Sequence, residues 1–234
     1  MSKLHEVVSR DAWLEARKRL LREEKEFTRR RDQLSEQRRA LPWEAVSKEY
    51  VFEGSDGKET LAQLFGELSQ LVVYHFMFDP SWDAGCKSCS FWADNFDGIG
   101  VHLAHRDIRF VAISRAPFAK LDAYRRRMGW RFKWLSSFGS DFNYDFGASF
   151  SAAEVASGTA DYNYARKKPW GEDVVGVSVF AKDSRGVFHT YSCYERGVDL
   201  LNGAYNYIDL TPKGRDEAGK NQFWVRRHDE YDHP

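Results

Sequence analysis

Two cysteines separated by two residues lie between a strand-like segment and a helix-like segment, and this placement limits the folds open to the chain. Residues 71–78 form a nearly continuous run of aliphatic and aromatic side chains, as in a strand covered on both faces. Cys86 and Cys89 follow, and an amphipathic stretch begins at Ser90. A helix N-terminus has unpaired backbone N–H groups and partial positive charge, which favour a thiolate over a thiol. The spacing therefore predicts a redox-active dithiol that opens a helix.

The segments after the dithiol continue the alternation of strand and helix. Residues 90–103 can form a helix, although Gly98 and Gly100 weaken its second half. Residues 107–114 predict a second buried strand, and Pro117 marks the start of another helix. A strand, a helix and a strand in this order imply a parallel pair with a right-handed crossover.

A β-hairpin is the strongest signal in the second half of the chain. Residues 174–181 and 187–192 are rich in β-branched and aromatic side chains and flank a turn at residues 182–186. A helix over about residues 197–207 follows. The resulting order, with a parallel pair first and an antiparallel hairpin second, is that of the thioredoxin fold. We therefore expect an α/β protein with a mixed central sheet flanked by helices.

The N-terminal segment predicts one long helix. Residues 11–40 contain neither Gly nor Pro, and a narrow apolar stripe repeats every seven residues between charged positions. The stripe consists of Trp13, Leu20, Phe27, Leu34 and Leu41. Such a stripe predicts contact with the globular part of the chain or with a second copy in a homodimer.

These patterns divide the chain into three parts. We expect an N-terminal helical arm over residues 1–42, a thioredoxin-like domain over residues 43–211 and a C-terminal extension over residues 212–234. The extension is polar and is predicted to lie on the surface. Residues 50–53 predict a strand before a short helix. Residues 130–170 show no regular spacing of apolar residues that would indicate a helix or a strand.

Composition restricts the partners. Thirty-five basic residues balance thirty-five acidic ones, so no overall field attracts nucleic acid or an anionic membrane. No apolar run approaches the roughly 20 residues of a membrane span, and no apolar signal segment opens the chain. Three cysteines are too few for a disulfide-stapled scaffold, and a close pair in a reducing compartment is typically catalytic or metal-binding. We expect a cytoplasmic protein without nucleic-acid or membrane partners.

The position of each cysteine at the start of the predicted helix predicts its role. Cys86, at the exposed first position, is the predicted nucleophile, and Cys89, one turn into the helix, resolves the mixed disulfide. Lys87 adds a positive charge beside them. The expected substrate is a protein or small-molecule thiol or disulfide, and no organic cofactor is expected. The third cysteine, Cys193, is expected to be a buried hydrophobic residue.

Nearby residues give supporting candidates. His75, within the strand that leads to the dithiol, is either a proton acceptor for the resolving thiol or a hydrogen-bonded core histidine. Asp79 and Asp83 precede Cys86, and their negative charge would raise its pKa and oppose the helix dipole.

Two other functions are alternatives to a redox-active dithiol. Cys86 and Cys89 are followed after twelve residues by His102 and then by His105, which approaches a zinc-finger ligand set. The two histidines have only two residues between them instead of three to five. The other alternative is a non-catalytic thioredoxin-like module that serves binding or assembly.

The sequence also resembles a bacterial family, thioredoxin-like in fold and catalogued as domain-of-unknown-function family 899, whose members are described as predicted dithiol-disulfide oxidoreductases. The matching segments are residues 20–26, 41–43, 74–78, 86–90, 114–117, 140–143 and 188–192, together with Trp82. The resemblance covers most of the chain. It implies the thioredoxin-like fold, dithiol chemistry at Cys86 and Cys89, and a supporting place for Trp82.

Overall fold

The protein divides into a helical unit and a larger α/β unit. The computed structural model describes residues 5–217 and 219–232. Its two compact units are Met1–Pro42 and Trp43–Pro234.

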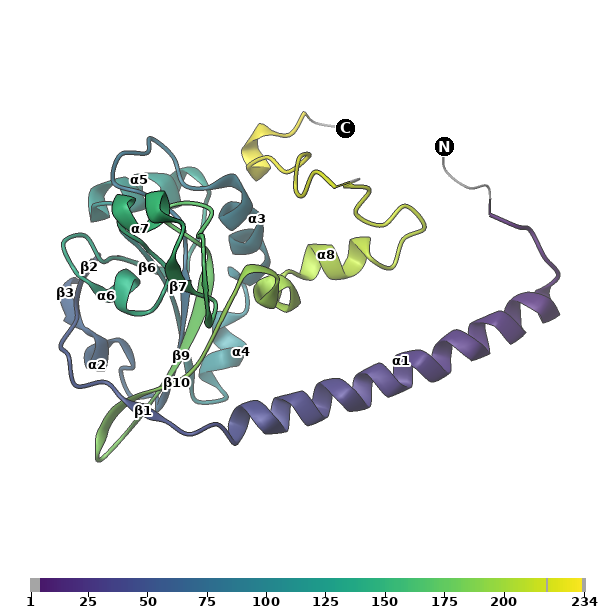
Figure 1. Ribbon diagram of the computed structural model, residues 1–234, viewed down its shortest axis with the longest axis horizontal. Helices are drawn as coiled ribbons and strands as arrows, with labels where there is room; N and C mark the ends of the chain where they lie inside the picture. Colours follow the sequence, from purple (N-terminus) through teal and green to yellow (C-terminus); the bar gives the residue numbers. More distant parts are fainter. Residues whose placement is uncertain (1–4, 218, 233–234) are drawn as a thin grey trace. The chain divides into compact units, whose positions relative to one another are not determined.

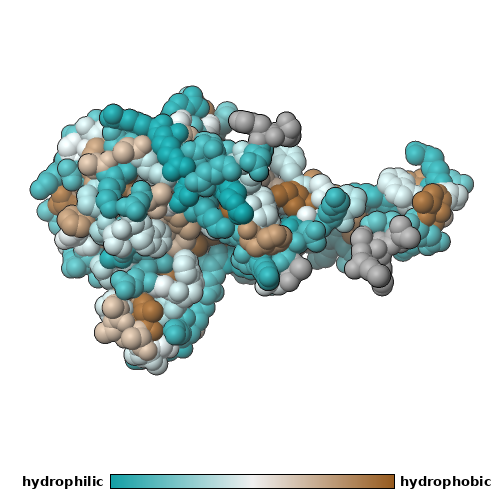
Figure 2. Space-filling view, turned by 90° about the horizontal axis from the view of Figure 1, so that it is seen from above, coloured by the Kyte–Doolittle hydropathy of each residue, from teal (hydrophilic) through white to brown (hydrophobic). Residues whose placement is uncertain are grey.

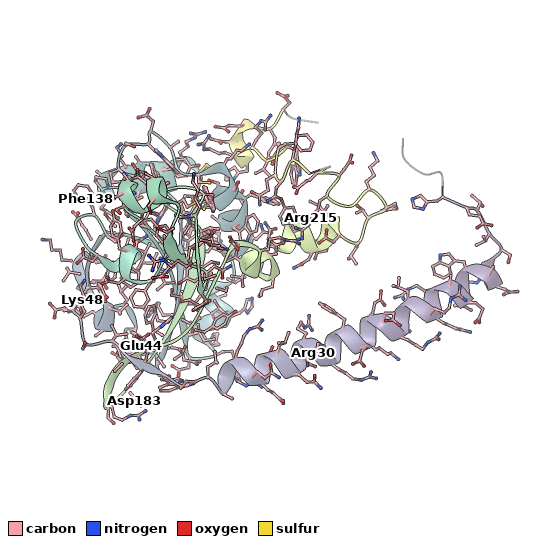
Figure 3. All side chains as sticks on the ribbon, viewed as in Figure 1. Arg30, Glu44, Lys48, Phe138, Asp183 and Arg215 are labelled. Atoms are coloured by element: carbon pink, nitrogen blue, oxygen red, sulfur yellow. The ribbon has the colours of Figure 1, made fainter. Side chains whose placement is uncertain are left out.

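The helical unit contains the predicted long helix, α1 (Arg10–Arg39). Ser9 caps its start by accepting a hydrogen bond from the Ala12 N–H, and Arg38 and Arg39 lie in its last turn, where positive charge favours the helix dipole. Side chains such as that of Arg30 project from all sides of α1 (Figure 3). The helix has no buried residue, and Phe27 is its most exposed apolar side chain at 70%.

A mixed sheet forms the centre of the α/β unit. Within the described residues its strand order is β1-β10-β9-β4-β5-β6-β2-β3. The strands are β1 (Glu44–Ala45), β2 (Val51–Gly54), β3 (Gly57–Thr60), β4 (Gln70–His75), β5 (Ile108–Ser114), β6 (Lys133–Ser136), β9 (Gly176–Asp183) and β10 (Gly186–Tyr194). A separate pair consists of β7 (Ala160–Tyr162) and β8 (Ala165–Lys167).

The connections of this sheet define a thioredoxin-like fold. Strands β4 and β5 are parallel, and the chain passes between them through α3 (Lys87–Phe96) and α4 (Gly100–Ala104). The helix α5 (Phe118–Arg127) follows β5, and the hairpin β9–β10 then adds antiparallel to β4. The order β10-β9-β4-β5, with β10–β9 and β9–β4 antiparallel and β4–β5 parallel, confirms the fold predicted from the sequence.

Strand β4 separates two hydrophobic clusters because successive side chains of a strand point to opposite faces. Tyr74 belongs to the cluster beneath α3 and α5, which also contains Cys89. Leu71 and Val73 belong to the cluster on the other face, beneath α2 (Leu61–Leu64) and α6 (Phe142–Asp145). Figure 1 shows α3 and α4 on one side of the sheet and α2 and α6 on the other.

Several elements differ from the sequence-based expectation. The helix expected over residues 90–103 is two helices, α3 and α4, interrupted near Gly98, where a residue without a side chain weakens the helix. The expected helix over residues 197–207 is the 3₁₀ helix η1 (Glu195–Leu201) followed by α8 (Gly203–Ile208). Elements not foreseen include α7 (Ala152–Ser157), the 3₁₀ helix η2 (His228–Glu230) and the strands β3, β6, β7 and β8.

The outer surface carries scattered apolar side chains among polar ones. The face shown in Figure 2 is mostly hydrophilic, with separate small hydrophobic spots. Among the described residues, none of the helices has both the length and the apolar character that crossing a membrane requires.

Candidate functional site

The two cysteines lie at the beginning of α3, directly after the segment that extends β4. Cys86 is the N-cap residue of α3, with φ −54° and ψ 129°. Its backbone N–H donates to the Met77 carbonyl over 3.1 Å, while the Met77 N–H donates to the Cys89 sulfur over 3.4 Å. Both cysteines are therefore held against the same residue of the preceding segment.

Close packing before the helix brings the backbone to this position. A Cβ atom added to Gly85 would lie 2.8 Å from Phe76 and 2.9 Å from Tyr124, both distances that real Cβ atoms do not reach. Glycine is thus the residue that lets the chain pass between these rings and enter α3 at Cys86.

The two thiols have opposite environments. Cys89 is buried with 1% of its surface exposed, whereas Cys86 is only partly buried, and both are thiols rather than a disulfide. A hydrogen bond from the Cys89 side chain is the main cause that lowers the pKa of Cys86, to about 6. The backbone N–H groups of Cys89 and Ser88 lower this pKa further, whereas burial opposes the shift. Burial, followed by the neighbouring Cys86, raises the pKa of Cys89 well above its usual value. At neutral pH this arrangement favours a thiolate at Cys86 and a thiol at Cys89.

A cavity of about 500 Å³ lies beside the dithiol. Its floor is apolar and includes Tyr74, Cys89 and Trp92, which are all buried. Polar side chains from η1 and from residues 221–222 form part of its rim, and the largely exposed Trp170 forms another part. The volume lies in the range of small-molecule pockets, and Cys86 contributes to the wall.

A chain of hydrogen bonds supports the first turn of α3 from the C-terminal extension. The Ser90 hydroxyl donates to the Cys86 carbonyl over 2.9 Å and accepts from the Tyr124 hydroxyl, also over 2.9 Å. Arg227 donates to the Tyr124 oxygen and to the Gly85 carbonyl, each over 2.8 Å. The extension therefore packs against the dithiol segment, which the sequence did not indicate.

A largely buried arginine fixes the loop between β4 and the dithiol. The Arg115 guanidinium forms ion pairs with Asp79 and with Asp173, the latter over 2.6 Å. The Arg115 side chain is 13% exposed and the Asp173 side chain 4%. Arg115 follows β5, so it joins the loop after β4 to the approach to β9. The charge of Asp79, considered above for its effect on the thiol, is paired with this arginine.

His75 does not contact the dithiol. It is buried on the opposite face of β4, stacks on Phe142 at 5.6 Å between ring centroids and hydrogen-bonds through Nε2 to the Ser178 hydroxyl over 2.9 Å. Burial lowers its pKa to about 3. Of the two interpretations, the structure favours the hydrogen-bonded core histidine, because the side chain after Tyr74 must point away from the face that Tyr74 shares with Cys89.

The other supporting candidates lie around the entrance to α3. Lys87 is half-buried, but the largest interactions that lower the Cys86 pKa come from Cys89 and Ser88. Asp83 is exposed, and Trp82 is 37% exposed with its carbonyl accepting from Lys120. Neither belongs to the cavity lining.

The alternative zinc ligands are not gathered into a site. His102 lies in α4 and His105 at its end, while the two cysteines lie at the start of α3. Across residues 5–217 and 219–232, no group of three or more His, Cys, Asp or Glu side chains is arranged to hold a metal ion. Cys193 is partly buried and packs against the same hydrophobic cluster as Cys89.

Tyr74 is a site residue that sequence reasoning missed. It is fully buried, lines the cavity with both cysteines and lies close enough to Cys89 for the two groups to affect each other's pKa. Alternation along β4 indicates that Tyr74 and Phe76 share a face, but only the structure shows that α3 covers that face.

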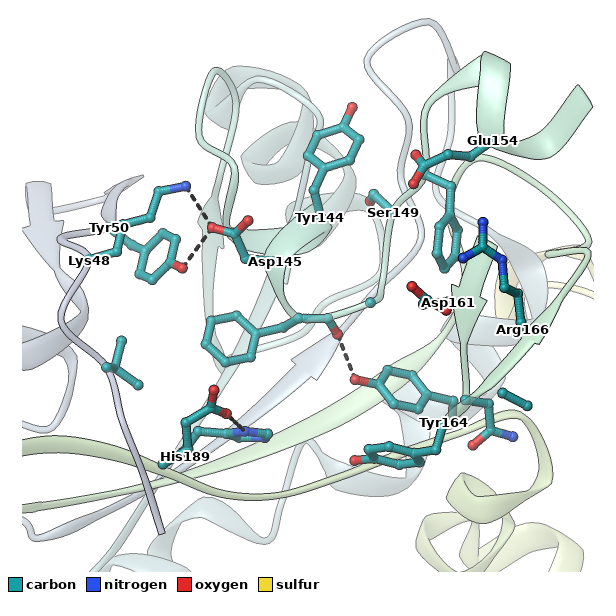
Figure 4. A pocket seen from close by; sticks show the side chains of 18 of the residues that line it. Lys48, Tyr50, Tyr144, Asp145, Ser149, Glu154, Asp161, Tyr164, Arg166 and His189 are labelled. Atoms are coloured by element: carbon teal, nitrogen blue, oxygen red, sulfur yellow. Dashed lines mark hydrogen bonds and ion pairs between the residues drawn. The ribbon is translucent and has the colours of Figure 1, made fainter. Parts of the chain in front are cut away.

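A second cavity, of about 760 Å³, shares no lining residue with the first. Figure 4 shows the side chains around it. Lys48 and Tyr50 both bind Asp145, over 2.7 Å each, and Glu44 lies 3.3 Å from His189. These charged and polar groups thus already satisfy one another.

The strand order and the dithiol segment define the class: a thioredoxin-fold protein with two adjacent thiols at the start of a helix. The family model described as "Bacterial protein of unknown function (DUF899)" matches residues 2–231, and the chain belongs to that family. No curated protein matches the sequence.

Several solved structures resemble this protein. Peroxidoxin BcpB from Mycobacterium tuberculosis is 15% identical, with 72% of this chain and 97% of that one covered and a TM-score of 0.46. A mutant of peroxiredoxin Q from Xanthomonas campestris is 12% identical, with coverages of 67% and 90% and a TM-score of 0.45. The mitochondrial 2-Cys peroxiredoxin from Plasmodium falciparum is 9% identical, with coverages of 73% and 95% and a TM-score of 0.44.

Proposed function

We propose that this protein is a thiol-disulfide oxidoreductase in which Cys86 attacks and Cys89 resolves. The observation that carries the proposal is the placement of the two thiols: Cys86 is the partly buried N-cap residue of α3, and Cys89 is buried one turn further along the helix. The pKa directions agree with it, lowered for Cys86 and raised for Cys89. A thiolate is the attacking form in thiol-disulfide exchange, and only Cys86 combines a lowered pKa with exposure.

The exchange proceeds in two balanced steps. The Cys86 thiolate attacks one sulfur of the substrate disulfide, so that a mixed disulfide forms and the other substrate sulfur leaves as a thiolate. Cys89 then attacks the Cys86 sulfur, its proton passes to the second departing substrate sulfur, and the Cys86–Cys89 disulfide forms. The substrate gains two electrons and the dithiol loses two. Attack on Cys86 by an external thiol returns the protein to the reduced state.

The surroundings fit this chemistry. The cavity of about 500 Å³ gives a thiol or disulfide substrate access to Cys86, while the burial of Cys89 restricts it to reaction within the protein. Exchange of this kind requires no bound organic cofactor. A cycling dithiol also suits the reducing cytoplasm expected from the sequence.

Variants of the two cysteines test the proposal. Cys86→Ser is expected to abolish reduction of insulin and of 5,5′-dithiobis(2-nitrobenzoate), whereas Cys89→Ser is expected to trap a mixed disulfide at Cys86, detected by mass spectrometry. Cys193→Ala is the matched control and should turn over normally.

Other outcomes assign the cysteines differently. Full activity of Cys86→Ser would contradict the proposal and leave a non-catalytic binding module. Stoichiometric zinc in the purified protein that is lost in either cysteine variant would indicate the metal site instead. Consumption of hydrogen peroxide without any disulfide reduction would assign Cys86 to peroxide chemistry.

A further inference from the structure

The hydroxyl of Tyr74 is a buried polar group without a hydrogen-bond partner. Tyr74 is 0% exposed, and its oxygen bonds to no atom among the described residues. A buried hydroxyl that lacks a partner has lost its hydration without compensation, so its presence requires an explanation. Its position supplies one, because Tyr74 lines the dithiol cavity together with Cys86 and Cys89.

Cys89 is the neighbouring group that this hydroxyl would serve, because Tyr74 and Cys89 belong to the same buried cluster and line the same cavity. Burial and then the negative charge of a Cys89 thiolate raise the pKa of Tyr74 well above its usual value, so the hydroxyl keeps its proton. In return, Tyr74 favours the Cys89 thiolate, against the larger effects of burial and of Cys86. The Cys89 sulfur otherwise accepts a hydrogen bond from the Met77 N–H, over 3.4 Å.

The charge on Cys89 changes during the exchange cycle. A thiol is a weak hydrogen-bond acceptor, whereas a thiolate accepts a strong, charge-assisted bond. In the reduced protein the Tyr74 hydroxyl makes no hydrogen bond within the described residues, and the raised pKa of Cys89 favours its protonated form. When Cys89 attacks the mixed disulfide, or leaves as a thiolate while an external thiol attacks Cys86, negative charge appears on a sulfur in a buried site.

We propose that Tyr74 donates a hydrogen bond to the Cys89 sulfur as that sulfur becomes charged, and thereby promotes the resolving step. This inference rests on the dithiol function proposed above. Tyr74 gains and loses no proton over the cycle: the proton of the Cys89 thiol leaves with the departing substrate thiol, and the Tyr74 proton stays on its oxygen. The effect is confined to steps in which Cys89 is negatively charged, so the first attack by Cys86 does not depend on it.

The test separates the two steps with 5,5′-dithiobis(2-nitrobenzoate) in a stopped-flow instrument. Attack by Cys86 releases the first nitrothiolate, and resolution by Cys89 releases the second. In Tyr74→Phe we expect the first release within a factor of two of the wild-type rate. The second release should be slower by about tenfold, as for the loss of a hydrogen bond to a charged group. Its pH profile should also move to higher pH.

Tyr162 provides a matched control. Its hydroxyl is also buried without a hydrogen-bond partner, but it belongs to the separate cluster with Phe150 and Ala160. Each Tyr→Phe change removes an unpaired buried hydroxyl, so both variants should melt at or above the wild-type temperature. Only Tyr74→Phe should slow the second release. A fluorinated tyrosine at position 74, which is a stronger donor of the same shape, should restore or exceed the wild-type rate.

Three results would overturn the role of Tyr74. The first is a wild-type rate and pH profile for the second release in Tyr74→Phe, or, if that variant does not fold, a slower second release with fluorotyrosine than with tyrosine. The second is equal slowing in Tyr162→Phe. The third is a wild-type protein that releases no second nitrothiolate, and only this result also removes the proposed dithiol function.

Discussion

At the scale of single residues, the behaviour of Cys86 depends on donors at the first turn of α3. The Cys89 side chain and the nearby N–H groups favour its negatively charged form, and burial only partly opposes them. The pKa of about 6 lies below the value of roughly 8.5 for a free cysteine. Deprotonation increases with pH, so most Cys86 should be thiolate at pH 7.

We therefore expect alkylation of Cys86 by iodoacetamide to follow a midpoint near pH 6. The rate should rise through this pH and level off below pH 8, because only the thiolate reacts. Peptide mapping by mass spectrometry measures the rate at each cysteine, with a model cysteine peptide as the reference. A midpoint at the peptide value would contradict the donor arrangement described for α3.

Arg115 matters at the same scale because it neutralises two partly buried carboxylates. Arg115→Met should destabilise the fold by about 3–5 kcal/mol, since Asp79 and Asp173 would lose their shared positive charge in a poorly hydrated site. Urea denaturation measures the change. Arg185→Met is the control, because Arg185 pairs with Asp183 on the exposed surface and should give no measurable loss. Equal effects in both variants would contradict a special role for the buried pairs.

At the scale of elements, local sequence patterns predicted the parts that form by local rules. The β9–β10 hairpin has a turn between two β-rich segments, and α5 follows a proline at its start. Strands β7 and β8 are three residues each and lack an apolar run long enough to indicate them. The interruption after α3 was indicated by Gly98, although its consequence, two separate helices, was not.

For the candidate site, too, local sequence patterns predicted only what consecutive residues determine. The dithiol at a helix start could be read from residues 71–90 alone, because strand, cysteines and helix are consecutive. The face of His75 could not, because nearly every residue around it is apolar and the usual polar-apolar alternation is absent. The contact of Arg227 with Gly85 joins residues 142 positions apart, which no local pattern encodes.

The loop before β9 makes an element-scale prediction. Trp170, 58% exposed, contributes to the rim of the dithiol cavity. Trp170→Ala should raise KM for an aromatic disulfide by about three- to tenfold through lost apolar contact, with the Cys86 alkylation profile unchanged. Trp43→Ala is the control, because Trp43 is similarly exposed but packs on Phe188 away from the cavity. Steady-state kinetics would contradict the cavity as the substrate site if KM did not change.

At the scale of the whole molecule, α1 carries a prediction about assembly. Its stripe includes Leu20, 54% exposed, and Phe27, 70% exposed, and such a row of apolar side chains is typical of a helix that packs on another surface. Deleting residues 1–40 should lower the melting temperature or the oligomeric mass measured by light scattering.

A point substitution sharpens that test. Phe27→Glu should reproduce the effect of the deletion, whereas Thr28→Glu, one position along and off the stripe, should not. If the deleted form keeps both the mass and the melting temperature of the full chain, the stripe has no packing role.

The support that Arg227 gives to the dithiol segment also has a consequence during synthesis. Arg227 is made 142 residues after Gly85, whose carbonyl it binds. At 5–20 residues per second, roughly 7–30 s pass between the translation of these two residues. For most of that interval the nascent chain carries both cysteines while the Gly85 carbonyl, and later the Tyr124 hydroxyl, still lack their arginine partner. The dithiol therefore acquires its final surroundings late in translation, after its own helix has left the ribosome.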